Sequence, residues 1–154
     1  MPRTSAGIAL FRRVSDGVEL FLAHPGGPFW RKKDDGAWTF PKGEYTEDED
    51  PLIAARREFR EEIGLDLGGE FIDLGTVKQA GGKLVRIFAV EGDCDPAAVR
   101  SNTFKQIWPP RSAQYVEFPE VDRTGWFSPS EARTKLIAAQ REFVGRLCAR
   151  LGLG

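Results

Sequence analysis

The sequence contains few of the residues from which many metal and redox sites are built. Its 154 residues include one histidine, His24, and two cysteines, Cys94 and Cys148. The cysteines lie far apart, and neither has a second cysteine or a histidine at a metal-binding spacing. This pattern favours free thiols over a disulfide or a zinc site. His24 ends an apolar segment, where a lone histidine is usually a loop or packing residue, and we assign it no role.

The chain also lacks long apolar runs and an excess of charge. No run approaches the roughly 18 apolar residues of a membrane span, and the N-terminal residues do not resemble a signal peptide. We therefore expect a cytoplasmic protein without membrane association. Since 22 basic residues nearly balance 23 acidic ones, no overall field favours nucleic acid. The length predicts one domain over residues 1–154.

Acidic, basic and glycine residues are concentrated between Gly43 and Leu65, in the segment GEYTEDEDPLIAARREFREEIGL. This segment resembles the Nudix box, G-x5-E-x7-R-E-U-x-E-E-x-G-U, in which U is a bulky aliphatic residue. Phe59 stands where Ile, Leu or Val is usual, and it is still bulky and apolar. All charged and glycine positions of the pattern match, at Gly43, Glu49, Arg57, Glu58, Glu61, Glu62 and Gly64.

The same segment predicts a helix. Residues Thr46 to Glu49 have the spacing of a capping box, and Pro51 suits the first turn of a helix. The helix should run from about Asp50 or Pro51 to Ile63, and Gly64 should end it. At 100 degrees per residue, one side of this helix is apolar and should be buried, namely Leu52, Ala55, Phe59 and Ile63.

Three carboxylates share another side of the predicted helix. Glu58 is three residues before Glu61 and four before Glu62, so these like charges are neighbours on the helix surface. They also occupy the C-terminal half, where the helix dipole disfavours anions. A solvated acidic surface is one interpretation. A divalent cation with hard oxygen ligands, Mg²⁺ or Mn²⁺, would relieve the repulsion.

The resemblance to the Nudix family implies a fold, a reaction and a ligand set. The implied fold is α/β, an α/β/α sandwich with a mixed sheet, and the implied reaction is hydrolysis of a nucleoside diphosphate linked to another group. It implies metal ligation by the Gly43 carbonyl, Glu58, Glu61 and Glu62, and pairing of Arg57 with Glu49. The catalytic group carried over is therefore Arg57, Glu58, Glu61, Glu62 and a further glutamate, and the resemblance does not fix which glutamate is the general base.

The further glutamate is Glu120 or Glu117. Many Nudix enzymes place a metal-binding or catalytic glutamate six residues before a tryptophan, and Glu120 has this offset from Trp126. Glu117 remains the alternative. We expect Glu120 to be a metal ligand and a catalytic residue.

Apolar and turn residues predict the remaining elements. A loop is expected at 25–36, and an extended loop that can hold a helical turn at 92–113. A capped helix begins at Ser128 and continues to about Leu151. Strands are expected at 5–12, 18–23, 37–40, 71–77, 84–90 and 114–118.

The loop at 25–36 carries Phe29, Trp30 and three consecutive cations at 31–33. It is either a solvated loop or a substrate lid in which an aromatic ring stacks on a base while cations meet phosphates. We include Trp30 and Trp38 among the substrate-binding candidates. Lys42 is a further candidate, as a phosphate contact or an exposed lysine.

The substrate is less well defined. The run Trp38-Thr39-Phe40-Pro41-Lys42-Gly43 resembles the lead-in found among diadenosine and diphosphoinositol polyphosphate hydrolases. We expect an Mg²⁺-dependent (or Mn²⁺-dependent) pyrophosphohydrolase acting on a dinucleoside polyphosphate or a nucleoside triphosphate, ahead of a nucleotide sugar. The alternative is a ligand-sensing domain without hydrolysis. The expected partner is a small-molecule nucleotide, and the sequence does not define the oligomeric state.

Overall fold

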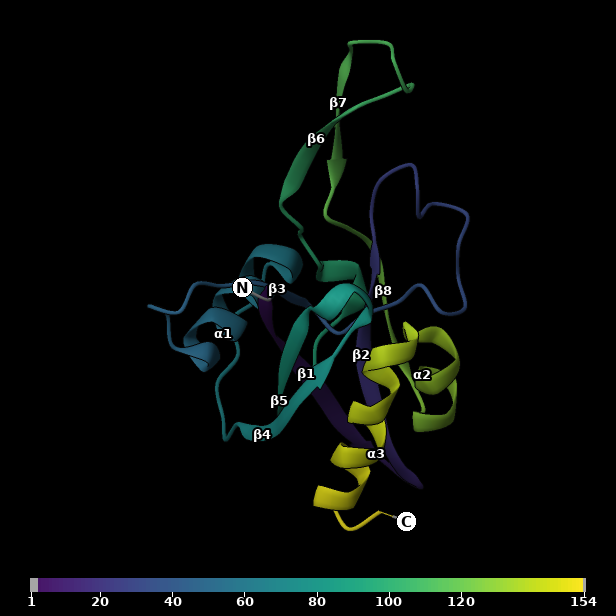
Figure 1. The fold of residues 1–154 in the computed structure, drawn as a ribbon. Coiled ribbons are helices and arrows are strands. Elements are labelled where there is room, and N and C mark those ends of the chain that lie inside the picture. Colours follow the sequence, from purple (N-terminus) through teal and green to yellow (C-terminus); the bar gives the residue numbers. More distant parts are fainter. Residues whose placement is uncertain (1–2, 154) are drawn as a thin grey trace.

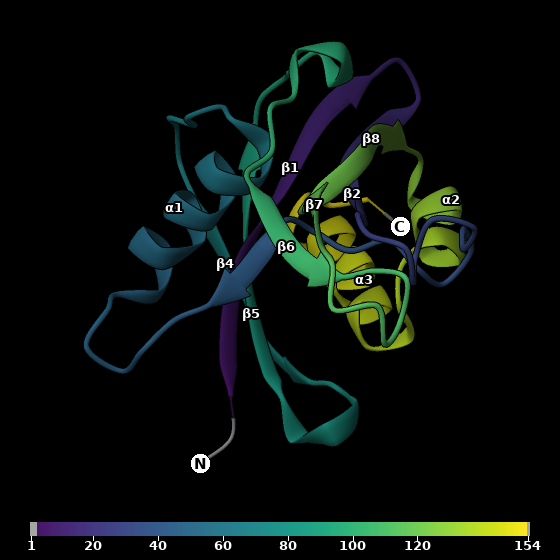
Figure 2. The same cartoon turned by 90° about the horizontal axis from the view of Figure 1, so that it is seen from above.

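The computed structural model describes residues 3–153 and is organised around one mixed β-sheet (Figures 1 and 2). The strands follow the order β4-β5-β1-β2-β8, and β3 pairs with β1 outside this path. The β1–β5 pair is parallel, and the other pairs are antiparallel. The strands of this sheet are β1 (Thr4–Val14), β2 (Gly17–Pro25), β3 (Lys42–Glu44), β4 (Ile72–Lys78), β5 (Leu84–Glu91) and β8 (Val121–Phe127).

Helices cover both faces of the sheet. On one face, α1 (Pro51–Ile63) packs with residues such as Ile8 and Phe21 in one buried cluster. On the other face, α2 (Pro129–Lys135) and α3 (Arg141–Arg150) contribute to a second cluster that includes Leu22 and Phe143. Figure 1 shows α1 and α3 on opposite sides of the strands. The predicted α/β/α sandwich with a mixed sheet is confirmed.

Helix α1 has the predicted body and end but a different cap. Gly64 lies in the left-handed region with φ 83°, and its amide donates to the Arg60 carbonyl, which ends the helix. The N-cap is Asp50, whose carboxylate accepts from the amides of Leu52 and Ile53. The predicted capping box at Thr46–Glu49 is therefore wrong, because Asp50 lies one residue before Pro51 and satisfies the free amides itself.

The segment 37–40 does not form the predicted strand. Thr39 exchanges both backbone hydrogen bonds with Ala23, whereas the Trp38 amide donates to Lys135 and its carbonyl accepts from Ile137. Because its neighbours differ from residue to residue, no continuous ladder forms. The strand begins later, at Lys42, and lies along the first half of β1.

The C-terminal region begins with the predicted capping box, in which Ser128 and Glu131 satisfy each other's backbone amides. It then departs from the predicted single helix. Leu136 has an extended backbone with ψ 146°, and the chain bridges to Trp38 before a 3-10 turn at Ala138–Gln140. The spacing of apolar residues predicted one continuous helix, because such a local pattern carries no information about the bridge between Leu136 and the distant Trp38.

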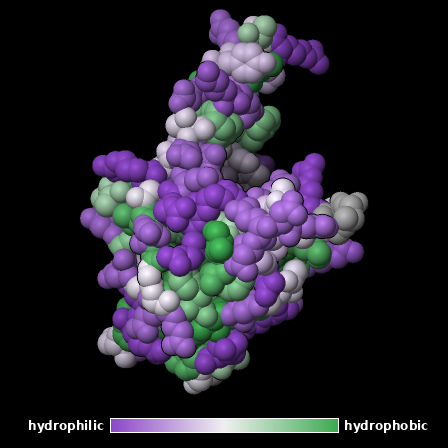
Figure 3. All heavy atoms as spheres, turned by 90° about the vertical axis from the view of Figure 1, so that its left-hand side faces the viewer, coloured by the Kyte–Doolittle hydropathy of each residue, from purple (hydrophilic) through white to green (hydrophobic). Residues whose placement is uncertain are grey.

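Residues 103–119 form a two-stranded ribbon outside the main sheet. Strands β6 (Thr103–Ile107) and β7 (Tyr115–Pro119) pair with each other and project from the body as an arm (Figures 1 and 3). The strand at 114–118 is confirmed as β7, whereas β6 and β8 were not predicted. The hairpin at 71–90 is confirmed as β4 and β5. None of the helices described in residues 3–153 has the length and hydrophobicity to cross a membrane.

Candidate active site

Arg57 connects Glu49, which precedes helix α1, with two glutamates of the helix itself. Its Nε and Nη2 atoms donate to the two carboxylate oxygens of Glu49 at 2.9 and 3.0 Å. Its Nη1 donates to Glu58 at 2.8 Å and lies 3.4 Å from Glu61. The hydrogen bond from Arg57 lowers the pKa of Glu49. Arg57 therefore lies at the centre of an ion-pair network that fixes three carboxylates of the site.

Glu58 lies directly on the backbone of Gly43. A Cβ atom on Gly43 would lie only 2.0 Å from Glu58 Oε2, which is closer than any side chain permits. β3 is in turn held against the first half of β1, where Gly43 pairs with Ala6. Burial raises the pKa of the Glu58 carboxyl, partly offset by the Arg57 hydrogen bond, and Glu61 adds repulsion. The glycine is required here for a close approach and not for a turn.

Glu62 is the buried carboxylate of the helix. Its residue is 8% exposed, and its Oε1 accepts from the backbone amide of Lys42 at 3.1 Å. Burial raises the pKa of Glu62 to about 8, although the Lys42 amide counteracts this effect. Burial also lowers the pKa of the Lys42 ammonium, and Lys42 lines the same cavity as Glu62.

Glu120 and Glu117 lie on opposite sides of the ribbon base. Glu120 lines the cavity that also holds Glu62, and its pKa is raised by burial and by repulsion from Glu61. Glu117 is exposed on the ribbon, where its carboxylate accepts a hydrogen bond from the Thr103 hydroxyl. This geometry favours Glu120 as the additional carboxylate.

Backbone hydrogen bonds connect these elements in series. The Asn102 amide donates to the carbonyl of Glu61 at 2.8 Å, and the Glu120 amide donates to the carbonyl of Asn102 at 2.8 Å. The Gly26 amide donates to the carbonyl of Glu120 at 2.9 Å. Helix α1, the ribbon base and the loop after β2 thus meet at one junction.

The cavity at this junction has a volume of about 280 Å³. Lys42, Glu62 and Glu120 supply its charged wall, and Trp30 lies at its edge with 37% of its surface exposed. The Lys33 ammonium lies 5.0 Å from the centre of the Trp30 ring. The remaining lining residues are Ala23, Pro25, Ala37, Thr39, Val121 and Ile137.

Trp38 does not line this cavity. It is 5% exposed, its indole donates to Asp34 at 2.8 Å, and it packs edge-on against His24 and Phe127. The substrate-binding hypothesis for Trp38 is therefore corrected to a supporting role beneath the site. Trp38 became a candidate through the lead-in at residues 38–43, but its large apolar surface is buried against His24 of β2 and Phe127 of β8.

His24 is a buried packing residue, as the sequence indicated, but its hydrogen-bond partners were not predicted. Its ring is fully buried, with Nδ1 2.7 Å from Asp122 Oδ1 and Nε2 2.6 Å from the carbonyl oxygen of Lys33. It therefore connects β2, β8 and the loop that carries Trp30. Asp122 is distant in sequence, and nothing in the local pattern around His24 indicates this contact.

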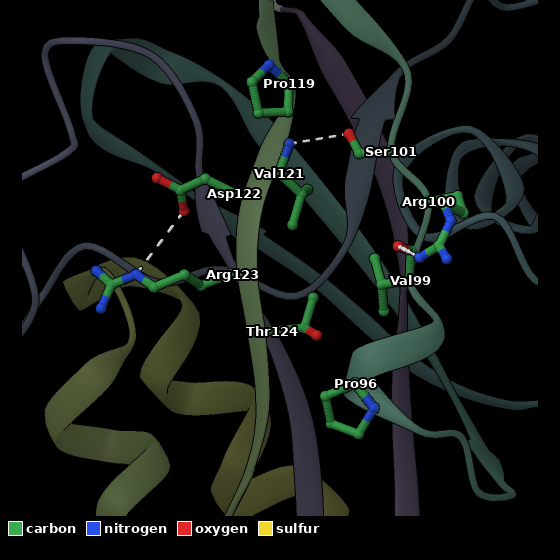
Figure 4. Close-up of a pocket in the computed structure, with 9 residues that line it drawn as sticks. All are labelled: Pro96, Val99, Arg100, Ser101, Pro119, Val121, Asp122, Arg123 and Thr124. Carbon is green, nitrogen blue, oxygen red and sulfur yellow. Dashed lines mark hydrogen bonds and ion pairs between the residues drawn. The ribbon is translucent and has the colours of Figure 1, made fainter.

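A second cavity, of about 320 Å³, lies beyond Val121 between β8 and residues 96–101 (Figure 4). Val121 lines both cavities, and its amide donates to the Ser101 hydroxyl oxygen at 3.0 Å. Figure 4 shows Asp122 and Arg123 on the far side of the strand from Val99. Because none of the α1 glutamates lines this second cavity, the acidic site is the first one.

The donor set fits a hard divalent cation. Glu58, Glu62 and Glu120 all have raised pKa values, with burial as the largest cause and a neighbouring carboxylate as another. A cation relieves both effects, and carboxylate oxygens are the ligands that Mg²⁺ and Mn²⁺ prefer. In residues 3–153 no three acidic, histidine or cysteine side chains already converge on one point. Arg57 holds Glu58 and the Lys42 amide holds Glu62, and of the α1 carboxylates only Glu62 lines the cavity.

The chain is similar to a known family in its sequence and to solved structures in its fold. Residues 1–147 match the NUDIX domain family. No curated protein sequence is similar enough to this chain to count as a match.

Several solved structures share the fold at low identity. A binary complex of the C. elegans Ap4A hydrolase is 20% identical, with a TM-score of 0.67 over 96% of this chain and 98% of that one. The NUDIX domain of Shewanella oneidensis NrtR, complexed with ADP ribose, is 14% identical, with a TM-score of 0.67 over 98% and 89%. A mutT/nudix family protein from Listeria innocua is 19% identical, with a TM-score of 0.64 over 99% and 96%.

Proposed function

Because the chain belongs to the Nudix family of pyrophosphohydrolases, we propose that it hydrolyses a nucleoside diphosphate linked to another group, in a reaction that depends on Mg²⁺ or Mn²⁺. The observation that carries the proposal is the position of Glu62. It is buried in the α1 wall of a cavity that Lys42 and Glu120 also line, beside the Arg57 network. Such an acidic wall suits a phosphate chain only when a cation accompanies it.

Some residues of the site would bind the cation, and Arg57 would position them. The cation ligands in this proposal are Glu58, Glu61, Glu62, Glu120 and the carbonyl of Gly43. A bound divalent cation would neutralise the phosphate charge and make water a better nucleophile. Arg57 orients Glu58 and Glu61 through the contacts at 2.8 and 3.4 Å, which is a positioning role.

Proton transfer in this site requires a carboxyl group that faces the cavity. A carboxyl whose pKa is near the working pH can both accept and release a proton, and burial raises the pKa of Glu62 to about 8. A cation beside it would lower that value again. We assign the general base to Glu62 or Glu120, since both face the cavity.

Lys42 and the 26–36 loop supply the substrate contacts. Lys42 lines the cavity and carries the charge that a phosphate group needs, and Trp30 offers an exposed ring at the cavity edge. Arg31, Lys32 and Lys33 are exposed beside it. A dinucleoside polyphosphate or a nucleoside triphosphate fits an aromatic ring followed by cations, and a nucleotide sugar fits less well because its second half carries no base.

A panel assay tests the proposal. Purified protein is incubated with Mg²⁺ and dinucleoside polyphosphates, nucleoside triphosphates and nucleotide sugars, and the products are separated by ion-exchange chromatography. We expect cleavage within the phosphate chain that EDTA abolishes. If no member of the panel is cleaved with Mg²⁺ or Mn²⁺, the enzymatic proposal fails, and nucleotide binding without turnover would identify a ligand sensor.

A further inference from the structure

Exposed apolar side chains are concentrated on two neighbouring segments. Of the seven large hydrophobic residues that are exposed within residues 3–153, two lie on the 26–36 loop and three lie on the ribbon. These are Phe29, Trp30, Ile107, Tyr115 and Val116, with exposed fractions between 37% and 70%. Exposed apolar residues on neighbouring segments mark a candidate binding surface, and the face of the ribbon on which each residue lies decides whether it belongs to that surface.

The two faces of the ribbon differ in what they contact. Residues at alternate positions of β6 share a face. Phe104 on one face packs against the loop, because a Cβ on Gly27 would lie 2.9 Å from its ring. Trp108, four residues on, contacts Phe29 with ring centres 6.1 Å apart in an edge-to-face arrangement. We call the face that carries Phe104 and Trp108 the inner face.

The opposite face of the ribbon, which we call the outer face, carries residues for which no contact with the 26–36 loop is found in the part of the chain that the structure describes. Ile107 pairs with Tyr115 there, and Lys105 pairs with Glu117. Tyr115 is 70% exposed and lies in the strand opposite Ile107. The outer face therefore provides an internal control for any effect of the inner face.

The inner face continues the candidate active site. Trp30 lines the cavity edge, and the preceding residue, Phe29, contacts Trp108 on the ribbon. The exposed cations at 31–33 form no ion pair among the described residues. Aromatic rings and unpaired cations thus extend from the cavity along the loop to the ribbon. Figure 2 shows this loop and the ribbon on the same side of the molecule.

We propose that Phe29 and Trp108 form a distal subsite for the second base of a two-ended nucleotide, whose other half occupies the cavity. The inference rests on the proposed function, since it assigns the part of the substrate that extends beyond the cleaved phosphate chain. Every base has an apolar face that stacks on an aromatic ring, and the cations at 31–33 neutralise the phosphates between the two bases.

The loop and the ribbon are already packed together, so the subsite requires little ordering when the ligand binds. Gly27 lies against Phe104, and the Gly26 amide is hydrogen-bonded to the carbonyl of Glu120 at the ribbon base. A pre-formed site loses less conformational entropy on binding than a mobile one.

The test compares two substrates in Trp108→Ala, Phe29→Ala and the outer-face control Tyr115→Ala. The substrates are a dinucleoside tetraphosphate and the mononucleoside tetraphosphate that lacks the second base. Loss of one stacking residue should reduce kcat/KM for the dinucleotide about five- to a hundredfold, mainly through KM. The mononucleotide should be cleaved at the wild-type rate, and Tyr115→Ala should leave both substrates unchanged.

A binding measurement keeps the inference independent of turnover. Calorimetric titration with a methylene-bridged dinucleotide reports affinity whether or not the protein cleaves that class. If Trp108→Ala binds the analogue as tightly as the wild type, or if both substrates lose activity equally, the distal subsite is wrong while the hydrolase proposal stands. Weaker binding by the variant in a protein that cleaves nothing would support the subsite and remove the enzymatic proposal.

Discussion

The carboxylate of Glu58 occupies the space in which any side chain at position 43 would lie, 2.0 Å from the position of a Cβ on Gly43. We therefore expect Gly43→Ala to push Glu58 away from β3 and to reduce turnover at least tenfold, with a small effect on stability because the displaced atoms are the end of a flexible side chain. Gly68→Ala is the matched control, because nothing lies within 4 Å of the added methyl group. Steady-state kinetics and urea unfolding measure both effects. Equal behaviour of the two variants would contradict this role of Gly43.

Glu62→Gln should reduce turnover by two orders of magnitude or more, because the buried carboxylate can no longer transfer a proton or bind a cation. Its effect on stability in EDTA should depend on pH. The pKa of Glu62 is raised to about 8 in the folded protein, so ionisation destabilises the wild type progressively as pH rises from about 4.5 and fully above 8.

The glutamine variant should therefore match the wild type near pH 5 and exceed its melting temperature by several degrees near pH 9. Thermal melts across this range, each with EDTA, measure the difference. A stability difference that does not grow with pH would mean that Glu62 is not the buried ionisable group.

Arg57→Lys should weaken the binding of Mn²⁺ about ten- to a hundredfold, because a lysine cannot make the two parallel hydrogen bonds to Glu49. Titration of Mn²⁺ by electron paramagnetic resonance, without nucleotide, measures the affinity. Arg60→Lys is the control on the same helix, since Arg60 contacts Asp66 outside the network. Unchanged affinity in Arg57→Lys would remove its positioning role.

Glu120→Gln should lower kcat at least tenfold, whereas Glu117→Gln should retain wild-type kcat. Glu120 faces the cavity, and Glu117 is bonded to Thr103 on the outer face of the ribbon. Parallel kinetics of the two variants decide between them, and the reverse result would exchange their assignments.

His24→Ala should destabilise the protein by roughly 2–4 kcal/mol, because two hydrogen bonds and a fully buried ring are lost together. It should also raise KM, since the ring holds the Lys33 carbonyl and thereby the loop that carries Trp30. Urea unfolding and kinetics give the two values. A destabilised variant with an unchanged KM would show that the bridge does not position the loop.

The predictions from the sequence were most accurate for elements that depend on interactions between residues close together in the chain. The body of α1 and its Gly64 terminus follow from period and capping, and the hairpins at 4–25 and 72–91 follow from apolar segments separated by turn residues. The family resemblance named the carboxylates, whereas their like charges on one helix face were compatible with either a solvated acidic surface or a bound cation.

The differences arise from contacts between distant segments. Trp38 looked like a binding residue, but its burial depends on Asp34, His24 and Phe127 in three different elements. The break at Leu136 depends on a bridge to Trp38. Strand β6 is short and has three polar residues among its five, and it forms because β7 supplies its partner. No local pattern contains this information.

The ribbon enters and leaves the body at two fixed points, Asn102 on the carbonyl of Glu61 and Glu120 on the carbonyl of Asn102. It shares no strand with the main sheet. Replacing residues 103–119 by an arm of another length or composition should therefore leave the main sheet and α1 intact, while it removes the contacts that Phe104 and Trp108 make with the 26–36 loop. Grafting such arms onto this scaffold offers a route to redesign what the enzyme recognises without rebuilding the machinery that cleaves it.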